Sequence, residues 1–137
     1  MPTGGIPVQS VKEHKKITDE IDDLYSDALF YEANLQTYLV QPRGGNRGEQ
    51  VLNFYRSFRG LFTHTRHMKG MDEIINEGKD TENKKNLIME VEEWFERGTD
   101  PKTRKHKYPD DFVRTGLDLF SKYQEKLIKK AVVSLVR

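Results

Sequence analysis

The sequence has no cysteine and no long apolar run. Without cysteine there are no disulfides, no thiolate metal ligands and no thiol nucleophile. None of the apolar runs approaches the roughly 20 residues that a membrane-spanning helix needs. The first ten residues, MPTGGIPVQS, lack the charged and apolar regions of a signal peptide. We therefore predict a soluble, cytoplasmic protein without membrane contacts.

Period-two alternation of apolar and polar residues is also missing, so we predict an all-α protein without a β-sheet. With 137 residues, the chain has the length of one domain. Prolines and glycines near the amino terminus predict an irregular lead-in over residues 1–9. The remaining residues, 10–137, are expected to form a single helical domain.

Apolar residues recur at steps of three and four, which is the helical pattern. This pattern predicts helices over residues 10–40, 49–77, 81–97 and from residue 110 onward. Ser10 with Glu13 has the spacing of a capping box, and Asp110 is the expected cap of the fourth helix. Short connections favour an up-down-up-down antiparallel four-helix bundle with a short third helix.

The helix predicted over residues 49–77 has two unlike faces. At about 100° per residue, one face collects Phe54, Phe58, Leu61, Phe62 and Thr65. The opposite face collects Arg56, Arg59, Thr63, Arg66 and His67. We predict that the first face belongs to the core and that the second offers positive charge to a partner. Two tyrosines near the flanks of their helices, Tyr31 and Tyr55, are candidates for stacking on a base.

The net charge is only +1, but the charges are segregated along the chain. Acids dominate residues 17–32 and 71–100, whereas bases dominate residues 41–70 and the segment after residue 101. In an antiparallel bundle, both basic loops lie at one pole, where helix amino termini add partial positive charge. Cations at successive helical turns can follow a phosphate backbone. These features predict a surface for nucleic acid or another polyanion, formed by Arg43, Arg47, Arg56, Arg59, Arg66, Lys102, Arg104, Lys105 and Lys107.

Acids at the same pole provide an alternative explanation of this charge. They can pair with part of the basic surface and leave a solvated face without a partner; they are Glu92, Glu93, Glu96, Asp110 and Asp111. The glycine-rich stretch RGGNRG, residues 43–48, is a single copy and is not followed by Lys-Ser or Lys-Thr. It is therefore interpreted as a linker rather than as an RNA-binding tract or a P-loop.

Arg59 and His64 form an R-x4-H pair, which resembles the motif of helical HEPN-type ribonucleases. The resemblance implies that this pair would activate a ribose hydroxyl. Here Gly60 follows the arginine, where a polar residue is more usual, and the two side chains lie about 140° apart on a helix. His64 and His67 lack the carboxylate one turn earlier that di-metal bundles use. We predict no metal, no cofactor and a non-enzymatic protein, with a ribonuclease as the second alternative.

Four apolar residues do not fit a closed monomer. Phe30 lies about 220° from the apolar seam of its helix, and Val132, Val133 and Val136 leave the seam of the fourth helix. Either the residues near the amino terminus cover this tail, or the four residues contact a second copy or another protein. The first function hypothesis is a nucleic-acid-binding module. Its alternative is a structural or adaptor subunit of a protein or virion-like assembly.

Overall fold

The computed structural model describes residues 8–41, 47–68, 70–76, 86–99 and 108–127, with side chains from residue 16 onward. Every regular element in these residues is a helix, which confirms the predicted all-α class. The helices are α1 (Val8–Val40), α2 (Arg47–Arg66), α3 (Met71–Ile75), α4 (Leu87–Gly98) and α6 (Asp110–Lys126).

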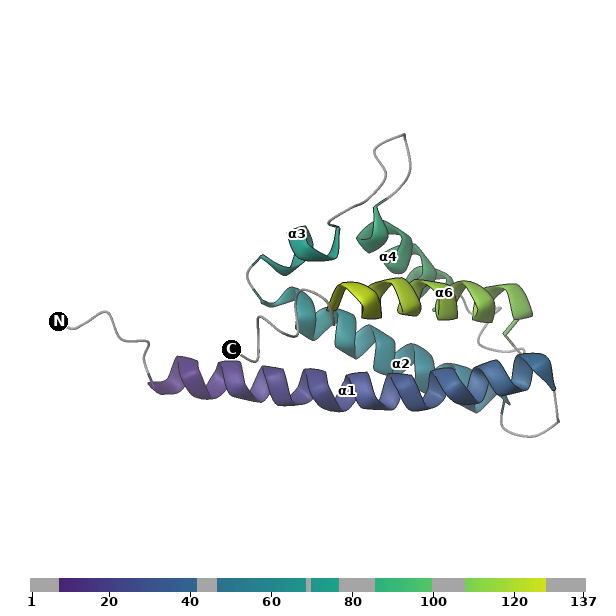
Figure 1. Ribbon diagram of the computed structural model, residues 1–137, viewed down its shortest axis with the longest axis horizontal. Helices are drawn as coiled ribbons and strands as arrows, with labels where there is room; N and C mark the ends of the chain where they lie inside the picture. The colour runs from purple at the N-terminus through teal and green to yellow at the C-terminus, as the bar shows by residue number, and fades with distance from the viewer. Residues whose placement is uncertain (1–7, 42–46, 69, 77–85, 100–107, 128–137) are drawn as a thin grey trace.

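The long helix α1 runs along the whole molecule, and α2 returns beside it in the opposite direction (Figure 1). These two helices form the most extensive helix pair of the fold, followed by α4 with α6. The colours of Figure 1 show that α6 runs in the same direction as α2. An up-down-up-down bundle of four helices stays a prediction, because the described residues form five helices.

The fifth helix arises because the predicted second helix is interrupted. We expected it to extend to residue 77, but α2 ends at Arg66 and α3 begins at Met71. Between them Gly70 has a φ of 82°, a left-handed conformation that glycine adopts without steric cost. Met68, Met71 and Ile75 are buried on both sides of this turn, so the apolar pattern continues through it.

The predicted apolar faces form the core. Phe58 is fully buried and contacts five aromatic rings from α2, α4 and α6, at centroid distances of 5.2 to 5.9 Å. Such ring pairs contribute beyond their buried area, each by about 0.5–1.5 kcal/mol. The core assignments of Phe54 and Phe62 are also confirmed, and Trp94 of α4 is buried with them. The core therefore fixes one side of α2 and leaves the opposite side available.

Two buried hydrogen bonds tie the aromatic core to the backbone. The Tyr55 hydroxyl donates to the Phe95 carbonyl oxygen at 2.8 Å, and the Trp94 indole donates to the Phe112 carbonyl oxygen at 2.8 Å. Tyr55 is thus a core residue and not the exposed stacking residue that we considered from the sequence. These bonds join α2 to α4 and α4 to α6.

Three helix starts and one helix cap differ from the predictions. Helix α1 begins at Val8, so the irregular lead-in does not extend to residue 9, and Ser10 lies inside the helix rather than at its N-cap position. Helix α2 begins at Arg47 instead of residue 49.

Helix α4 begins at Leu87 instead of residue 81, because the Asn86 side chain accepts a hydrogen bond from the Met89 N–H at 2.9 Å and caps the helix. Helix α6 has Pro109 as its N-cap residue, without a side-chain cap bond. The prediction that Asp110 caps this helix is wrong, since Asp110 is its first helical residue.

Candidate functional site

An open groove follows the exposed side of α2. Its volume is about 890 Å³, and α2 contributes Glu49, Leu52, Arg56, Arg59, Thr63 and His64 to its lining. The other wall includes Gly98 and Thr99, where α4 ends, and Tyr108, just before α6. Of the five residues predicted to face a partner, Arg56, Arg59 and Thr63 thus border a concave surface. Arg66 and His67 do not line it.

Arg56 and Arg59 are both exposed residues of this groove. Among the described acids, none forms an ion pair with either guanidinium, although four other cationic side chains of α2, α4 and α6 have acidic partners. The two residues are three positions apart, which places them on adjacent turns of one helix face. They provide two positive charges at the rim of the groove.

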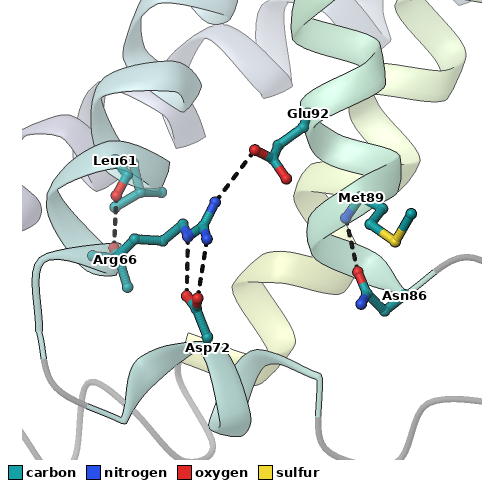
Figure 2. Close-up of polar contacts among 7 residues, drawn as sticks. Leu61, Arg66, Asp72, Asn86, Met89 and Glu92 are labelled. Atoms are coloured by element: carbon teal, nitrogen blue, oxygen red, sulfur yellow. Dashed lines mark hydrogen bonds and ion pairs between the residues drawn. The ribbon is translucent and has the colours of Figure 1, made fainter.

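Arg66 has a different environment. Its guanidinium lies between Asp72 of α3 and Glu92 of α4, as Figure 2 shows. Its Nε and one terminal nitrogen each contact an Asp72 oxygen at 3.0 Å, and the other terminal nitrogen lies 3.4 Å from Glu92. The pKa of Arg66 is raised, mainly because of its hydrogen bonds with Asp72. Arg66 is therefore an internal bridge between three helices rather than a free cation.

Arg47 is also paired with an acid. At the start of α2 it forms an ion pair with Asp110, the first residue of α6. This pair joins the first residue of α2 to the first residue of α6. The remaining predicted binding residues, Arg43, Lys102, Arg104, Lys105 and Lys107, lie outside the described residues. The described residues on either side of residues 100–107, Thr99 and Tyr108, both line the groove with Arg56 and Arg59.

The R-x4-H pair lies in the same groove, since Arg59 and His64 both line it. The His64 Nε2 atom is 3.2 Å from a carboxylate oxygen of Glu20 on α1. Its Nδ1 atom is buried and has no hydrogen-bond partner in the described structure. His64 therefore has Nε2 in contact with Glu20 and Nδ1 buried.

A three-ring stack supports the far wall of the groove. Tyr108 is stacked on Phe112 with a centroid distance of 5.1 Å, and Phe112 is stacked on Trp94 at 4.7 Å. Tyr108 is buried, which we did not predict from the sequence. The residue follows a segment rich in lysine and precedes a proline, a context without helical periodicity. This wall could not be found from an apolar pattern.

The predicted partner-binding residue Phe30 is 62% exposed, which agrees with its place on the outer side of α1. Its ring has an edge contact with Tyr31 at 5.3 Å. Val40, on the last turn of α1, is 80% exposed. The other predicted partner residues, Val132, Val133 and Val136, lie outside the described residues.

Within the described ranges, no three histidine or acidic side chains gather as a metal site. None of the helices described combines the length and apolarity required to cross a membrane. Comparison of this chain with protein-family models, curated proteins and solved structures gives no match.

Proposed function

We propose that this protein binds nucleic acid through the groove on α2, with Arg56 and Arg59 contacting phosphates. The supporting observation is that these two arginines border a concave surface without described acidic partners. Guanidinium groups recognise phosphate with paired, charge-assisted hydrogen bonds. The proposal names fewer residues than the binding surface predicted from the sequence, because Arg47 and Arg66 are already in ion pairs.

The basic residues between Thr99 and Tyr108 belong to this proposal. The segment begins and ends at described residues that line the groove. Its sequence, DPKTRKHK, adds Lys102, Arg104, Lys105 and Lys107. Additional cations near Arg56 and Arg59 would increase affinity for a phosphate backbone without selecting a base sequence.

Fluorescence anisotropy with labelled oligonucleotides tests this proposal. Binding is expected to weaken as salt increases, because phosphate contacts release counterions. The double variant Arg56→Glu/Arg59→Glu should abolish binding at low salt. Arg97→Glu is the matched control, since Arg97 is exposed on α4 and pairs with Asp111. Wild-type protein that does not bind at low salt, or a double variant that binds normally, would refute the proposal.

A ribonuclease is a second candidate, favoured by the common groove of Arg59 and His64. Cleavage would require a His64 nitrogen to accept the proton of a ribose 2′-hydroxyl. The contact of Nε2 with Glu20 and the burial of Nδ1 oppose that role. Incubation of labelled RNA with the wild type and with His64→Ala tests the candidate. Cleavage that persists in His64→Ala excludes this pair as its source.

A structural or adaptor subunit is supported by a different observation. Phe30 and Val40 expose apolar surface on α1, and neither residue lines the groove. Exposed apolar residues of this size on one helix provide a contact area for another chain. The two roles are compatible, because they use different helices of the fold.

A further inference from the structure

The dimensions of the groove restrict what can enter it. Its volume of about 890 Å³ is within the range of small-molecule sites, about 300–1,000 Å³. A duplex keeps its bases stacked inside and presents phosphates on the outside, so it could contact only the rim. A single strand can place individual nucleotides inside the groove.

The chemistry of the walls differs between rim and interior. Arg56 and Arg59 supply charge, whereas half-buried Leu52 supplies apolar surface and the buried Tyr108 lies in the opposite wall. Gly98 lines the same wall without a side chain. Bases bind proteins by stacking or packing on apolar and aromatic groups, while their phosphates contact cations. The groove offers both kinds of contact within one site.

Acids mark both ends of the groove. Glu49 lines the groove near the start of α2, and Glu20 forms an ion-pair contact with His64 near the other end of the groove. The 15 residues from Glu49 to His64 span about 22 Å of helix. A long polyanion that continued along α2 would meet these carboxylates. The cationic part between them is limited to Arg56 and Arg59.

We infer that the groove is a site for a short stretch of single-stranded nucleic acid. Two successive phosphates contact Arg56 and Arg59, and a base packs on Leu52. This inference rests on the proposed function, and it adds that the bases as well as the backbone are recognised. It also assigns a role to Leu52, which neither the charge pattern nor the core explains.

Anisotropy titrations with four probes test the inference. The probes are a labelled eight-nucleotide RNA, the DNA of the same sequence, its duplex, and labelled heparin as a polyanion without bases. We expect both single strands to bind at least tenfold more tightly than the duplex and heparin. Two phosphate contacts predict a slope of log K against log salt of about −1.4 for a single strand, and Arg59→Gln should reduce it to about −0.7.

Leu52→Gln tests the base contact separately. It should weaken binding of the single strands about fivefold and leave the salt slope unchanged, because no charge is altered. Val40→Gln, at an exposed position of α1, is the matched control and should bind as the wild type does. Circular dichroism of each variant establishes that the fold is retained.

Three results would overturn the inference in different ways. Equal binding of heparin, duplex and single strands would reject the base contact and leave the proposed polyanion function intact. Failure of every probe to bind at low salt would reject both. Normal binding of the single strands by a folded Leu52→Gln variant would remove Leu52 from the site and contradict the inference.

Discussion

Arg66 and Asp72 are joined by two hydrogen bonds of 3.0 Å, which use both oxygens of the carboxylate. Glu92 adds a third contact, so this arginine connects α2 to α3 and α4 (Figure 2). Arg59 lies on the same helix but borders the groove without a described acidic partner. Two arginines that look alike in the sequence therefore have different roles in the fold.

This difference predicts opposite effects of the same substitution at the two positions. Arg66→Gln should lower the free energy of unfolding by about 1 kcal/mol, because it removes a paired, charge-assisted contact. It should leave oligonucleotide binding unchanged. Arg59→Gln should weaken binding several-fold and leave stability unchanged. Urea denaturation and anisotropy measure the two quantities, and a binding loss in Arg66→Gln as large as that in Arg59→Gln would contradict the assignment.

We predict that the protein loses stability at alkaline pH because the Tyr123 hydroxyl is buried. Burial raises the pKa of this hydroxyl above 10.0, an effect that nearby Thr65 only partly opposes. Above about pH 10 the unfolded chain releases the Tyr123 proton, whereas the folded chain retains it. The free energy of unfolding therefore falls as the pH rises. Tyr123→Phe should show a smaller fall between about pH 9.5 and 11.5 in urea denaturation.

The same variant makes a second prediction at neutral pH. The Tyr123 hydroxyl is buried and has no geometrically satisfactory hydrogen bond in the described structure. Removing an unsatisfied buried hydroxyl should stabilise the protein, by about 1 kcal/mol. A Tyr123→Phe variant that is markedly less stable than the wild type at pH 7 would show that this hydroxyl has a partner.

Gly116 on α6 is predicted to tolerate no side chain. A Cβ atom at this position would collide with the Trp94 indole, which is fully buried. Gly116→Ala should therefore destabilise the protein by about 1–3 kcal/mol, in spite of the higher helix propensity of alanine. Gly48→Ala is the control, because a Cβ there meets nothing within 4 Å. The control should be neutral or stabilising by up to about 1 kcal/mol in thermal unfolding.

Phe30 makes a prediction about assembly. Its side chain is largely exposed, so Phe30→Gln should change the free energy of unfolding by less than about 0.5 kcal/mol. If the outer side of α1 contacts a second copy, the substitution should reduce the average mass measured by light scattering at high concentration. A wild type that is strictly monomeric at high concentration would exclude self-association through Phe30.

The faces of the helices were predictable because burial follows a simple period. The five positions of the predicted core face of α2, from Phe54 to Thr65, are all buried, and Arg56, Arg59 and Arg66 are all exposed. The end of α2 was not predictable in this way. Buried Met68, Met71 and Ile75 continue the apolar spacing across Gly70, and a period of three and four does not distinguish one helix from two. The start of α4 did have a local signal, since Asn86 is a favoured N-cap residue directly before an apolar run.

The groove could not be predicted from the sequence, because it is formed by contacts between helices that no local sequence pattern contains. Its two walls are separated by about 40 residues along the chain, between α2 and the end of α4. Pairing of Arg66 with Glu92 and of Arg47 with Asp110 likewise requires the packed helices. The sequence suggested that acids would neutralise some of the arginines, but only the fold distinguishes those in ion pairs from Arg56 and Arg59.

The most direct test of the α2 groove is an NMR titration that observes the arginine side chains. The Nε–Hε signals of the 16.1 kDa protein would be followed as an eight-nucleotide single strand is added. We predict shifts at Arg56 and Arg59 that saturate together, and unchanged signals at Arg47 and Arg66. Saturating shifts at Arg47 and Arg66 with unchanged Arg56 and Arg59 would contradict the groove as the binding site.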